Sequence, residues 1–435
     1  MPIRTALSLL RAAFIAALTA TVLPMTAHAA AGDPLGPDFR VDSGTGTGVL
    51  SPAMARDSIG NGVVVWERLG SSAPGIHARR YGADGSTQGV EFAVPLADGI
   101  PAVAMAPAGD FVVSSSSYDA VAGRYRIQFQ LYAADGSTRG AATEVASYSK
   151  PARGLIANLP APVAMDADGN FTVIWNQASV SNIGGGFGPT YLSTSTNVIH
   201  GRSYGADGVA RGAAFLVHAD LPDIVPLNGA PGLGIPALAM DAEGNFITAW
   251  INHNIRSNIV EYKRYNAAGK AQGLMQRANA ISMKLPFAAS IAADPMGGFV
   301  IVWAERDGDS SEPAQVWVQR YSRAGTALGA PLAANSPTAD LVQAPSVGVQ
   351  PGGGFVVAWT RYSLAVDSWT IAAQRFASGG TAQGGNFQVN SQAPGYQRNP
   401  AVAVDGYGDF AIAWAQGAQL GNAFDGIYLR LYHGN

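Results

Sequence analysis

The chain has 435 residues, including 53 glycines, 26 prolines and no cysteine, and only 13% of its residues are charged, against roughly 25% in an average globular domain. The absence of cysteine excludes disulfides, thiol nucleophiles and Cys-ligated zinc or iron–sulfur centres. A formal net charge of −3, without any cluster of Lys and Arg, excludes the basic surface that nucleic-acid binding requires. A hydrophobic content of 48% is enough to build a large core.

The N-terminus has the pattern of an export signal. Arg4 and Arg11 precede a mostly apolar run over 12–23, and Pro24 and the small-residue sequence Ala-His-Ala at 27–29 follow it. We therefore expect a signal peptide at 1–29 and a mature periplasmic or secreted protein over 30–435; an uncleaved anchor is the alternative. No later segment approaches the roughly 18 apolar residues that a membrane span needs, so we expect no span.

The mature chain consists of sequence repeats. Segments such as VAMDADGNFTVIW (163–175) and VAVDGYGDFAIAW (402–414) are copies of one unit that ends in Trp. Aligned on that position, the seven repeats place there Trp66, Ser115, Trp175, Trp250, Trp303, Trp359 and Trp414. An aromatic residue follows in each repeat, at Tyr81, Tyr132, Tyr204, Tyr265, Tyr321, Phe376 and Tyr432. Because these aromatic positions recur regardless of loop length, we expect them to pack between repeats.

Each repeat is predicted to form four strands. A small-residue run such as PAVAM (101–105) leads through a tight turn to a β-branched strand ending at the Trp position, and two further strands flank a Gly-bracketed turn. Four strands at a period of about 50 to 60 residues are typical of propeller blades. The sequence thus predicts an all-β, seven-bladed β-propeller, with blades at approximately 51–99, 100–159, 160–234, 235–285, 286–343, 344–399 and 400–435.

The two ends of the chain are predicted to meet in the last blade. The seventh repeat stops after its third strand, whereas GPDFRVDS (36–43) matches the fourth-strand sequence GGNFQVNS (384–391). An N-terminal strand at 36–43 that completes the last blade would close the ring and remove two open sheet edges. The alternative, an open array of separate four-stranded units, leaves those edges unpaired.

The repeats resemble those of roughly 50 residues, with a GxFVVAW-like strand and a QRY-AxG-xxxG-xEFxVN-like hairpin, that recur in secreted bacterial repeat proteins taken to be β-propellers. The resemblance covers essentially the whole mature chain. It implies a propeller fold and is nearly silent on activity, because propellers host binding, protein interaction, sugar cleavage and lyase chemistry.

Loop lengths suggest where a site lies. The second-to-third-strand and repeat-to-repeat connections vary, and the longest, 146–160, 176–199 and 218–235, surround the third blade. Long loops on a rigid scaffold commonly carry function. Residues there and in the next blade that suit sugar stacking and hydroxyl binding are Tyr148, Arg153, Tyr191, Asp220, Asp223, Asn252, His253 and Arg256. We expect a monomer that binds a glycan, or a surface protein, on this face; polar residues simply covering exposed loops are the alternative.

Catalysis at the same face is the competing function. Candidate carboxylate pairs for a glycoside hydrolase are Asp220 with Asp223 and Asp307 with Asp309. The candidate set for a polysaccharide lyase is Tyr191, His253 and Arg256. The DADGN sequence at 166–170 spaces its oxygen ligands as a calcium loop does, but it falls at a tight turn where Asp, Gly and Asn are favoured for backbone reasons. We expect no metal site and no cofactor.

Overall fold

The computed structural model describes residues 32–44, 48–69, 73–149, 160–182, 192–219, 223–226, 235–254, 257–279, 284–307, 314–336, 340–363, 367–391, 395–417 and 424–434. The predicted signal peptide at 1–29 lies outside them. Every regular element in these ranges is a β-strand. Among the described residues no helix has the length and apolarity to cross a membrane.

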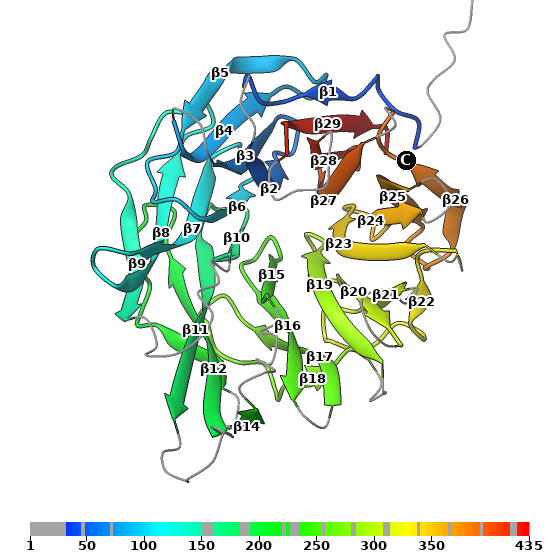
Figure 1. The fold of residues 1–435 in the computed structure, drawn as a ribbon. Helices are drawn as coiled ribbons and strands as arrows, with labels where there is room; N and C mark the ends of the chain where they lie inside the picture. The colour runs from blue at the N-terminus through cyan, green and yellow to red at the C-terminus, as the bar shows by residue number, and fades with distance from the viewer. Residues whose placement is uncertain are drawn as a thin grey trace, which may run out of the picture.

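The strands form sheets arranged as a ring (Figure 1), which confirms the all-β propeller architecture. The first sheet comprises β2 (Val49–Arg56), β3 (Gly62–Arg68), β4 (Gly75–Tyr81) and β5 (Thr87–Ala93). The second comprises β6 (Ile100–Met105), β7 (Phe111–Asp119), β8 (Arg124–Tyr132) and β9 (Thr143–Ser149). The third comprises β10 (Val163–Met165), β11 (Phe171–Asn182), β12 (Leu192–Tyr204), β13 (Phe215–Ala219) and β14 (Asp223–Pro226).

Two more four-stranded sheets and one large sheet complete the ring. The fourth sheet comprises β15 (Ala237–Met240), β16 (Phe246–Asn254), β17 (Ser257–Tyr265) and β18 (Gln276–Arg277). The fifth comprises β19 (Leu285–Ala293), β20 (Phe299–Arg306), β21 (Ala314–Tyr321) and β22 (Leu332–Ala333). The eight-stranded sheet comprises β1 (Phe39–Arg40), β23 (Leu341–Val349), β24 (Phe355–Ser363), β25 (Ser368–Phe376), β26 (Ala382–Gln388), β27 (Tyr396–Val404), β28 (Phe410–Gly417) and β29 (Gly426–Tyr432).

The expectation of seven separate blades therefore needs correction. The first five repeats form five separate sheets, but the sixth and seventh repeats share the eight-stranded sheet. The connection is a single parallel pair, Trp369 with Tyr396, between β25 and β27. The first strand of the seventh repeat, β27, starts beside the third strand of the sixth, β25. The repeat pattern in the sequence does not indicate this contact between repeats.

The predicted N-terminal strand pairs with the C-terminal strand. β1 runs antiparallel to β29, with Phe39 opposite Leu429 (Figure 1). Beyond the strand, the Val41 N–H donates to the Ile427 carbonyl at 2.7 Å, and the Ile427 N–H donates to Asp42 Oδ1 at 2.7 Å. The sixth repeat contains the same bond, since the Ile371 N–H donates to Asn390 Oδ1 at 2.9 Å. The segment 36–43 thus replaces the fourth strand that the seventh repeat lacks.

A buried charged cluster connects the same N-terminal segment to the first repeat. Glu91 Oε1 lies 2.7 Å from an Arg68 guanidinium nitrogen and 2.8 Å from His77 Nδ1. Its other oxygen accepts hydrogen bonds from the Ser43 N–H and hydroxyl, both at 2.8 Å. Burial by itself raises the pKa of Glu91, but the bonds from His77 and Ser43 and the charge of Arg68 outweigh it and lower that pKa to about 2. The N-terminal segment therefore joins the last repeat to the first.

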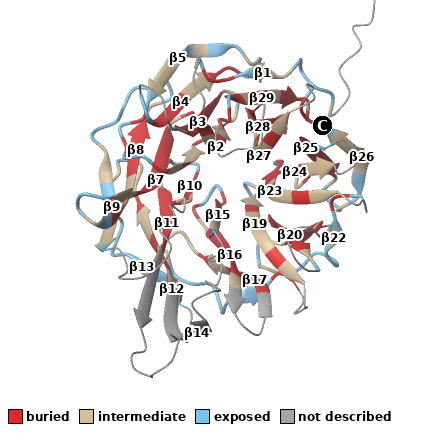
Figure 2. Ribbon diagram, viewed as in Figure 1, coloured by how far each residue is buried: buried red, intermediate tan, exposed pale blue. Residues whose placement is uncertain are grey.

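The repeated aromatic residues form the core, as expected. In six repeats the aromatic residue of the third strand stacks on the Phe that opens the second strand; Phe410 and Tyr432, for example, have ring centroids 4.7 Å apart. The framework tryptophans are at most 3% exposed. Seven hydrophobic clusters lie between successive repeats, including one between the seventh and the first, and Figure 2 shows the buried residues distributed around the whole ring.

The ring has two different faces. The tight turns between first and second strands and between third and fourth strands lie on one face, called here the short-turn face. There the Ser58 N–H donates to the Pro107 carbonyl at 3.1 Å and the Gly406 N–H donates to the Ser58 carbonyl at 3.2 Å, so neighbouring turns are bonded to each other. The remaining connections lie on the opposite, long-loop face.

Candidate functional site

The third repeat is enlarged on the long-loop face, as its sequence suggested, but by additional sheet structure. β11 and β12 are 12 and 13 residues long and extend outwards from the ring (Figure 1). β12 pairs with both β13 and β14, which gives this repeat a fifth strand. The described part of the insertion thus lengthens the third sheet.

The structure describes half of the predicted ligand-binding residues. Tyr148 and Asn252 have described side chains. Asp223 and His253 are described by their backbones, at positions paired with Ser195 in β12 and Asn258 in β17. The other four, Arg153, Tyr191, Asp220 and Arg256, lie outside the described residues.

The two described side chains belong to different surroundings. The Asn252 amide donates to the carboxylate of Glu261 at 3.2 Å within the fourth sheet, and Glu261 is 2% exposed. Tyr148 instead bridges two repeats, because its hydroxyl donates to the Asn176 carbonyl at 2.6 Å. Asn252 therefore supports its own sheet, whereas Tyr148 lies where the second repeat meets the enlarged third.

Tyr148 is the end of a row of three tyrosines, called here the tyrosine ladder. Tyr118 lies opposite Tyr125, and Tyr125 lies opposite Tyr148, in the strand registers of the second sheet. The centroids of Tyr118 and Tyr125 are 5.1 Å apart, and those of Tyr125 and Tyr148 are 5.3 Å apart with an interplanar angle of 22°. Sequence reasoning missed Tyr118 and Tyr125; the signal that could have found them is their placement on either side of one hairpin.

Charged groups lie on the opposite face of the second sheet from the tyrosine ladder, because Arg124 and Arg126 alternate with Tyr125 along β8. Arg126 lies 3.2 Å from the Asp119 carboxylate, and Arg124 donates to the Ser147 hydroxyl at 2.9 Å. Hydrogen bonds from backbone N–H groups, that of Ala122 above all, lower the pKa of Asp119 and keep it ionised. Burial raises the pKa of Tyr148, so its hydroxyl stays protonated and can donate. The stacked tyrosine rings provide an aromatic surface of the kind that packs against sugar faces.

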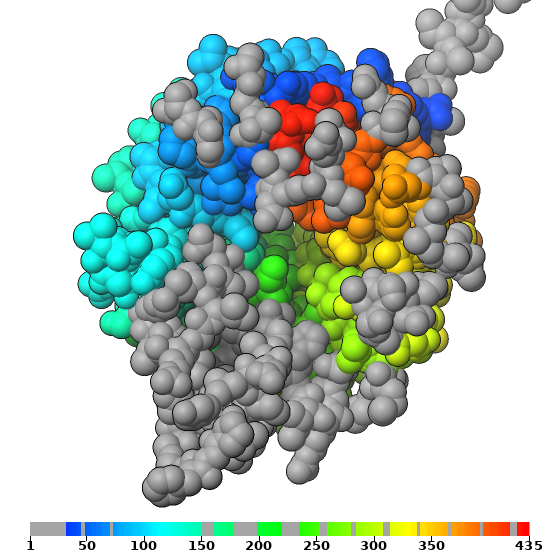
Figure 3. Space-filling model, in the orientation of Figure 1, coloured from blue at the N-terminus to red at the C-terminus, as the bar shows by residue number. Residues whose placement is uncertain are grey.

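A cavity of about 360 Å³ lies on the ring axis at the short-turn face. Its walls come from the first strands and turns of all seven repeats and include Met105, Met165, Met240 and the acidic residues Asp57, Asp166, Asp241 and Asp405. Figure 3 looks onto the long-loop face, at the other end of the ring axis, where the surface is also recessed near the centre. The cavity at the short-turn face lies opposite the predicted binding face.

The carboxylates of this cavity are used by the turns themselves. In the DADGN turn, Asp166 Oδ1 accepts the N–H groups of Asp168 and Asn170 at 3.0 and 2.8 Å. Its second oxygen accepts the Asn170 amide at 2.9 Å. Asp166 and Asn170, two of the residues considered as calcium ligands, are thus hydrogen-bonded to each other. Within the described ranges no three or more His, Asp or Glu residues are grouped so that they could hold a metal ion. The turn hydrogen bonds account for this sequence without a metal.

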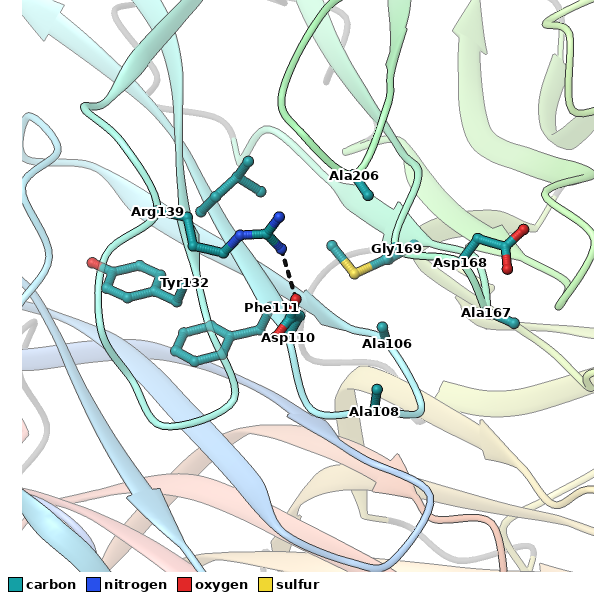
Figure 4. Close-up of a pocket in the computed structure, with 12 residues that line it drawn as sticks. Ala106, Ala108, Asp110, Phe111, Tyr132, Arg139, Ala167, Asp168, Gly169 and Ala206 are labelled. Atoms are coloured by element: carbon teal, nitrogen blue, oxygen red, sulfur yellow. Dashed lines mark hydrogen bonds and ion pairs between the residues drawn. The ribbon is translucent and has the colours of Figure 1, made fainter.

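A smaller pocket of about 80 Å³ lies between the second and third repeats. Figure 4 shows Arg139 reaching Asp110 across it, at 2.6 Å, with Tyr132 and Phe111 behind. The pocket is small and is lined by framework residues, so the ion pair has a structural role in joining two turns of the second repeat.

The carboxylate pairs considered for catalysis are not assembled within the described residues. Asp307 is 3.3 Å from Lys284 Nζ in an exposed ion pair. Its partner Asp309, like Asp220, lies outside the described residues. The structure thus provides an aromatic platform on the long-loop face, next to the enlarged sector.

Solved structures with the same arrangement are distant in sequence. No protein-family model matches the chain, and no curated protein matches it. The chain is similar to the polysaccharide lyase Uly1, with a TM-score of 0.50 and 12% identity over 88% of this chain and 90% of that one. A PL25 ulvan lyase bound to a GlcA–Rha3S saccharide gives a TM-score of 0.48 and 9% identity over 91% and 96% of the two chains. The β-propeller domain of the trilobed protease from Pyrococcus furiosus gives 0.46 and 7% identity over 89% and 94%. At such identities the likeness concerns the fold alone.

Proposed function

We propose that the protein is exported, and that as a monomeric seven-bladed propeller it binds a glycan of the cell envelope or environment at the second and third repeats of its long-loop face. Export rests on the sequence of residues 1–29. The count of seven treats β23–β26 as one blade and β27–β29 with β1 as another. The seven hydrophobic clusters between successive repeats support that count.

The tyrosine ladder is the observation that carries glycan binding. Tyr118 and Tyr148 are half-buried, so part of each ring is open at the molecular surface. Stacked tyrosines are held rigidly by their neighbours, and the bond from Tyr148 to Asn176 fixes the end of the row. A rigid aromatic surface loses little side-chain entropy on binding a sugar face.

A polysaccharide lyase or glycoside hydrolase acting on the same face is the second candidate. The shared fold with Uly1 makes this reaction class relevant, although one fold supports many functions. The residues that such an enzyme would use are Asp220, Asp223 and the set Tyr191, His253 and Arg256, which the sequence assigns to the third and fourth repeats. Binding is the better supported function because its residues are assembled in the structure.

The experiment is a panel of immobilised neutral and acidic polysaccharides incubated with the mature protein. Retention reports binding, and new reducing ends or unsaturated products report catalysis. Tyr118→Ala should weaken retention of the bound polysaccharide about threefold to tenfold, the effect of losing one aromatic contact. The matched control is Tyr407→Ala, since Tyr407 is 73% exposed on the short-turn face, and it should leave retention unchanged.

The outcomes separate the candidates. Retention without products supports a binding module. Products that disappear in Asp220→Asn, Asp223→Asn or His253→Ala variants would replace it with the enzyme. Equal retention of wild type and Tyr118→Ala would remove the tyrosine ladder as the site, and a complete lack of retention and products would leave contact with a surface protein as the remaining function.

A further inference from the structure

A second aromatic cluster lies on the long-loop face where the sixth and seventh repeats meet. Tyr362, at the end of β24, and Trp369, at the start of β25, have ring centroids 4.8 Å apart. Arg398, near the start of β27, places its guanidinium carbon 4.1 Å from the centroid of Trp369. Tyr396 pairs with Trp369 through the backbone. These four residues are called here the Trp369 cluster.

Among the described residues Arg398 differs from neighbouring cations because no carboxylate lies within ion-pair distance of it. On the same face Arg361 lies near Asp340 and Lys284 near Asp307. No such ion pair involves Arg398 in the described part of the chain. Asp367, the acidic residue next to the cluster, accepts a hydrogen bond from the Tyr362 hydroxyl at 2.6 Å instead. Burial, uncompensated by a carboxylate, lowers the pKa of Arg398.

The backbone holds Arg398 in place. A β-bulge between Arg398 and Ala401 interrupts the pairing of β27 with β28. Asn399 adopts a left-handed conformation with φ of 56°, and its N–H donates to the buried Thr360 hydroxyl at 3.2 Å. Ser51 and Ala344 have the same conformation before proline in the first and sixth repeats, so the bulge belongs to the fold. An arginine immediately before it is particular to the seventh repeat.

A buried polar side chain next to Arg398 also lacks a partner. Gln397 is 1% exposed, and neither its amide nitrogen nor its amide oxygen has a hydrogen-bond partner within the described residues. Buried amides without partners are rare in folded proteins and mark sites where a water or ligand group is expected. Gln397 alternates with Arg398 along β27, so its amide lies on the other face of the sheet and is one of several buried polar groups without a partner in the described part of the chain.

We propose that the Trp369 cluster binds the anionic group, carboxylate or sulfate, of an acidic saccharide through Arg398. With one face on the Trp369 indole, the guanidinium presents its edge, which matches a two-oxygen anion with two parallel hydrogen bonds. Tyr362 and Tyr396 flank the position that the sugar ring would take. The proposal rests on the proposed glycan binding and adds an anionic subsite in another sector of the same face.

The test titrates the mature protein by calorimetry with three oligosaccharides: a uronate oligomer, a sulfated dextran oligomer and a neutral dextran oligomer. The wild type should prefer at least one acidic oligomer, and this preference should decrease at high salt. Arg398→Gln should weaken binding of that oligomer about tenfold or more and leave neutral binding unchanged. Arg398→Lys keeps the charge but not the planar fork, so it should lie between the two.

Arg361→Gln is the matched control, because Arg361 already has Asp340 as its partner. Melting curves verify that each variant is folded. The uronate and sulfated arms identify which anion the site takes. Wild-type binding of both acidic oligomers no tighter than the neutral one, or a folded Arg398→Gln variant that binds acidic oligomers as the wild type does, would overturn the proposal.

The two proposals fail separately. If Tyr118→Ala abolishes retention while Arg398→Gln changes nothing, the tyrosine ladder stands and the anionic subsite is wrong. If Arg398→Gln weakens acidic binding while Tyr118→Ala changes nothing, the anionic subsite stands and the tyrosine ladder is wrong.

Discussion

Asp42 is the residue through which closure of the ring can be tested most sharply. Its side chain is buried, and its Oδ1 accepts the N–H of Ile427 in the last strand at 2.7 Å. Replacing Asp42 by Ala leaves the Ile427 amide buried without an acceptor. Equivalent bonds to Asn279, Asn335 and Asn390 occupy the same place in three other repeats.

The expected cost of Asp42→Ala is about 2 to 3 kcal/mol of unfolding free energy, the range for a buried amide that loses a charged acceptor. The bond between Asp42 and Arg40 adds little, because the Arg40 side chain is 37% exposed and solvent screens the pair. Asp42→Asn keeps the acceptor and reproduces the residue of the other repeats, so it should cost less than about 1 kcal/mol.

The assay is denaturant unfolding monitored by fluorescence of the buried tryptophans, with Asn390→Ala as the control for the same bond inside the sixth repeat. Asp42→Ala and Asn390→Ala should be destabilised by similar amounts, and deletion of residues 33–43 by more than either. A deletion variant as stable as the intact protein would refute closure by this strand. An Asp42→Asn variant as unstable as Asp42→Ala would show that charge, and not the acceptor, matters.

Three further predictions concern pH, the tyrosine ladder and the inner strands. The pKa of Glu91 is about 2 in the folded protein, against an ordinary 4.5. This difference contributes roughly 3 kcal/mol to the free energy of unfolding; the contribution is fully present above pH 4.5 and is lost as the pH falls towards 2. Glu91→Gln should therefore flatten the acid unfolding curve in that pH window. Tyr148→Phe, which loses the bond to Asn176 but keeps the stacking, should lower stability by about 1 kcal/mol and reduce glycan retention less than Tyr148→Ala does. Gly348→Ala should lower the melting temperature although most repeats have Ala there, since its Cβ would lie 2.7 Å from the Val404 side chain.

Most of the fold could be predicted from the sequence because the same pattern of residues recurs in every repeat. The small-residue strand, the Trp position and the Gly-bracketed turn recur with fixed spacing, and the match of residues 36–43 to 384–391 identified the strand that closes the ring. The shared sheet of the last two repeats was not predictable in this way. It depends on the pairing of Trp369 with Tyr396, two residues in variable parts of their repeats.

The site was predicted less completely. Loop lengths identified the third repeat as enlarged, but residues 176–182, 192–199 and 223–226 of the inserted segments belong to strands, because alternating Ser, Thr and β-branched residues can extend a hairpin. Tyr148 was identified, whereas Tyr118 and Tyr125 were missed because the register that aligns them is set by a hairpin outside the repeat pattern. Arg398 was missed because its lack of a carboxylate partner is a property of the packed structure.

Hydrogen–deuterium exchange of the mature protein, measured with and without a retained glycan, tests directly whether the glycan binds on the long-loop face. We expect slower exchange in peptides that cover 111–126 and 143–149, and unchanged exchange in those that cover 56–60 and 404–408 around the axial cavity. Protection confined to the axial cavity, with residues 111–126 unaffected, would contradict binding on the long-loop face.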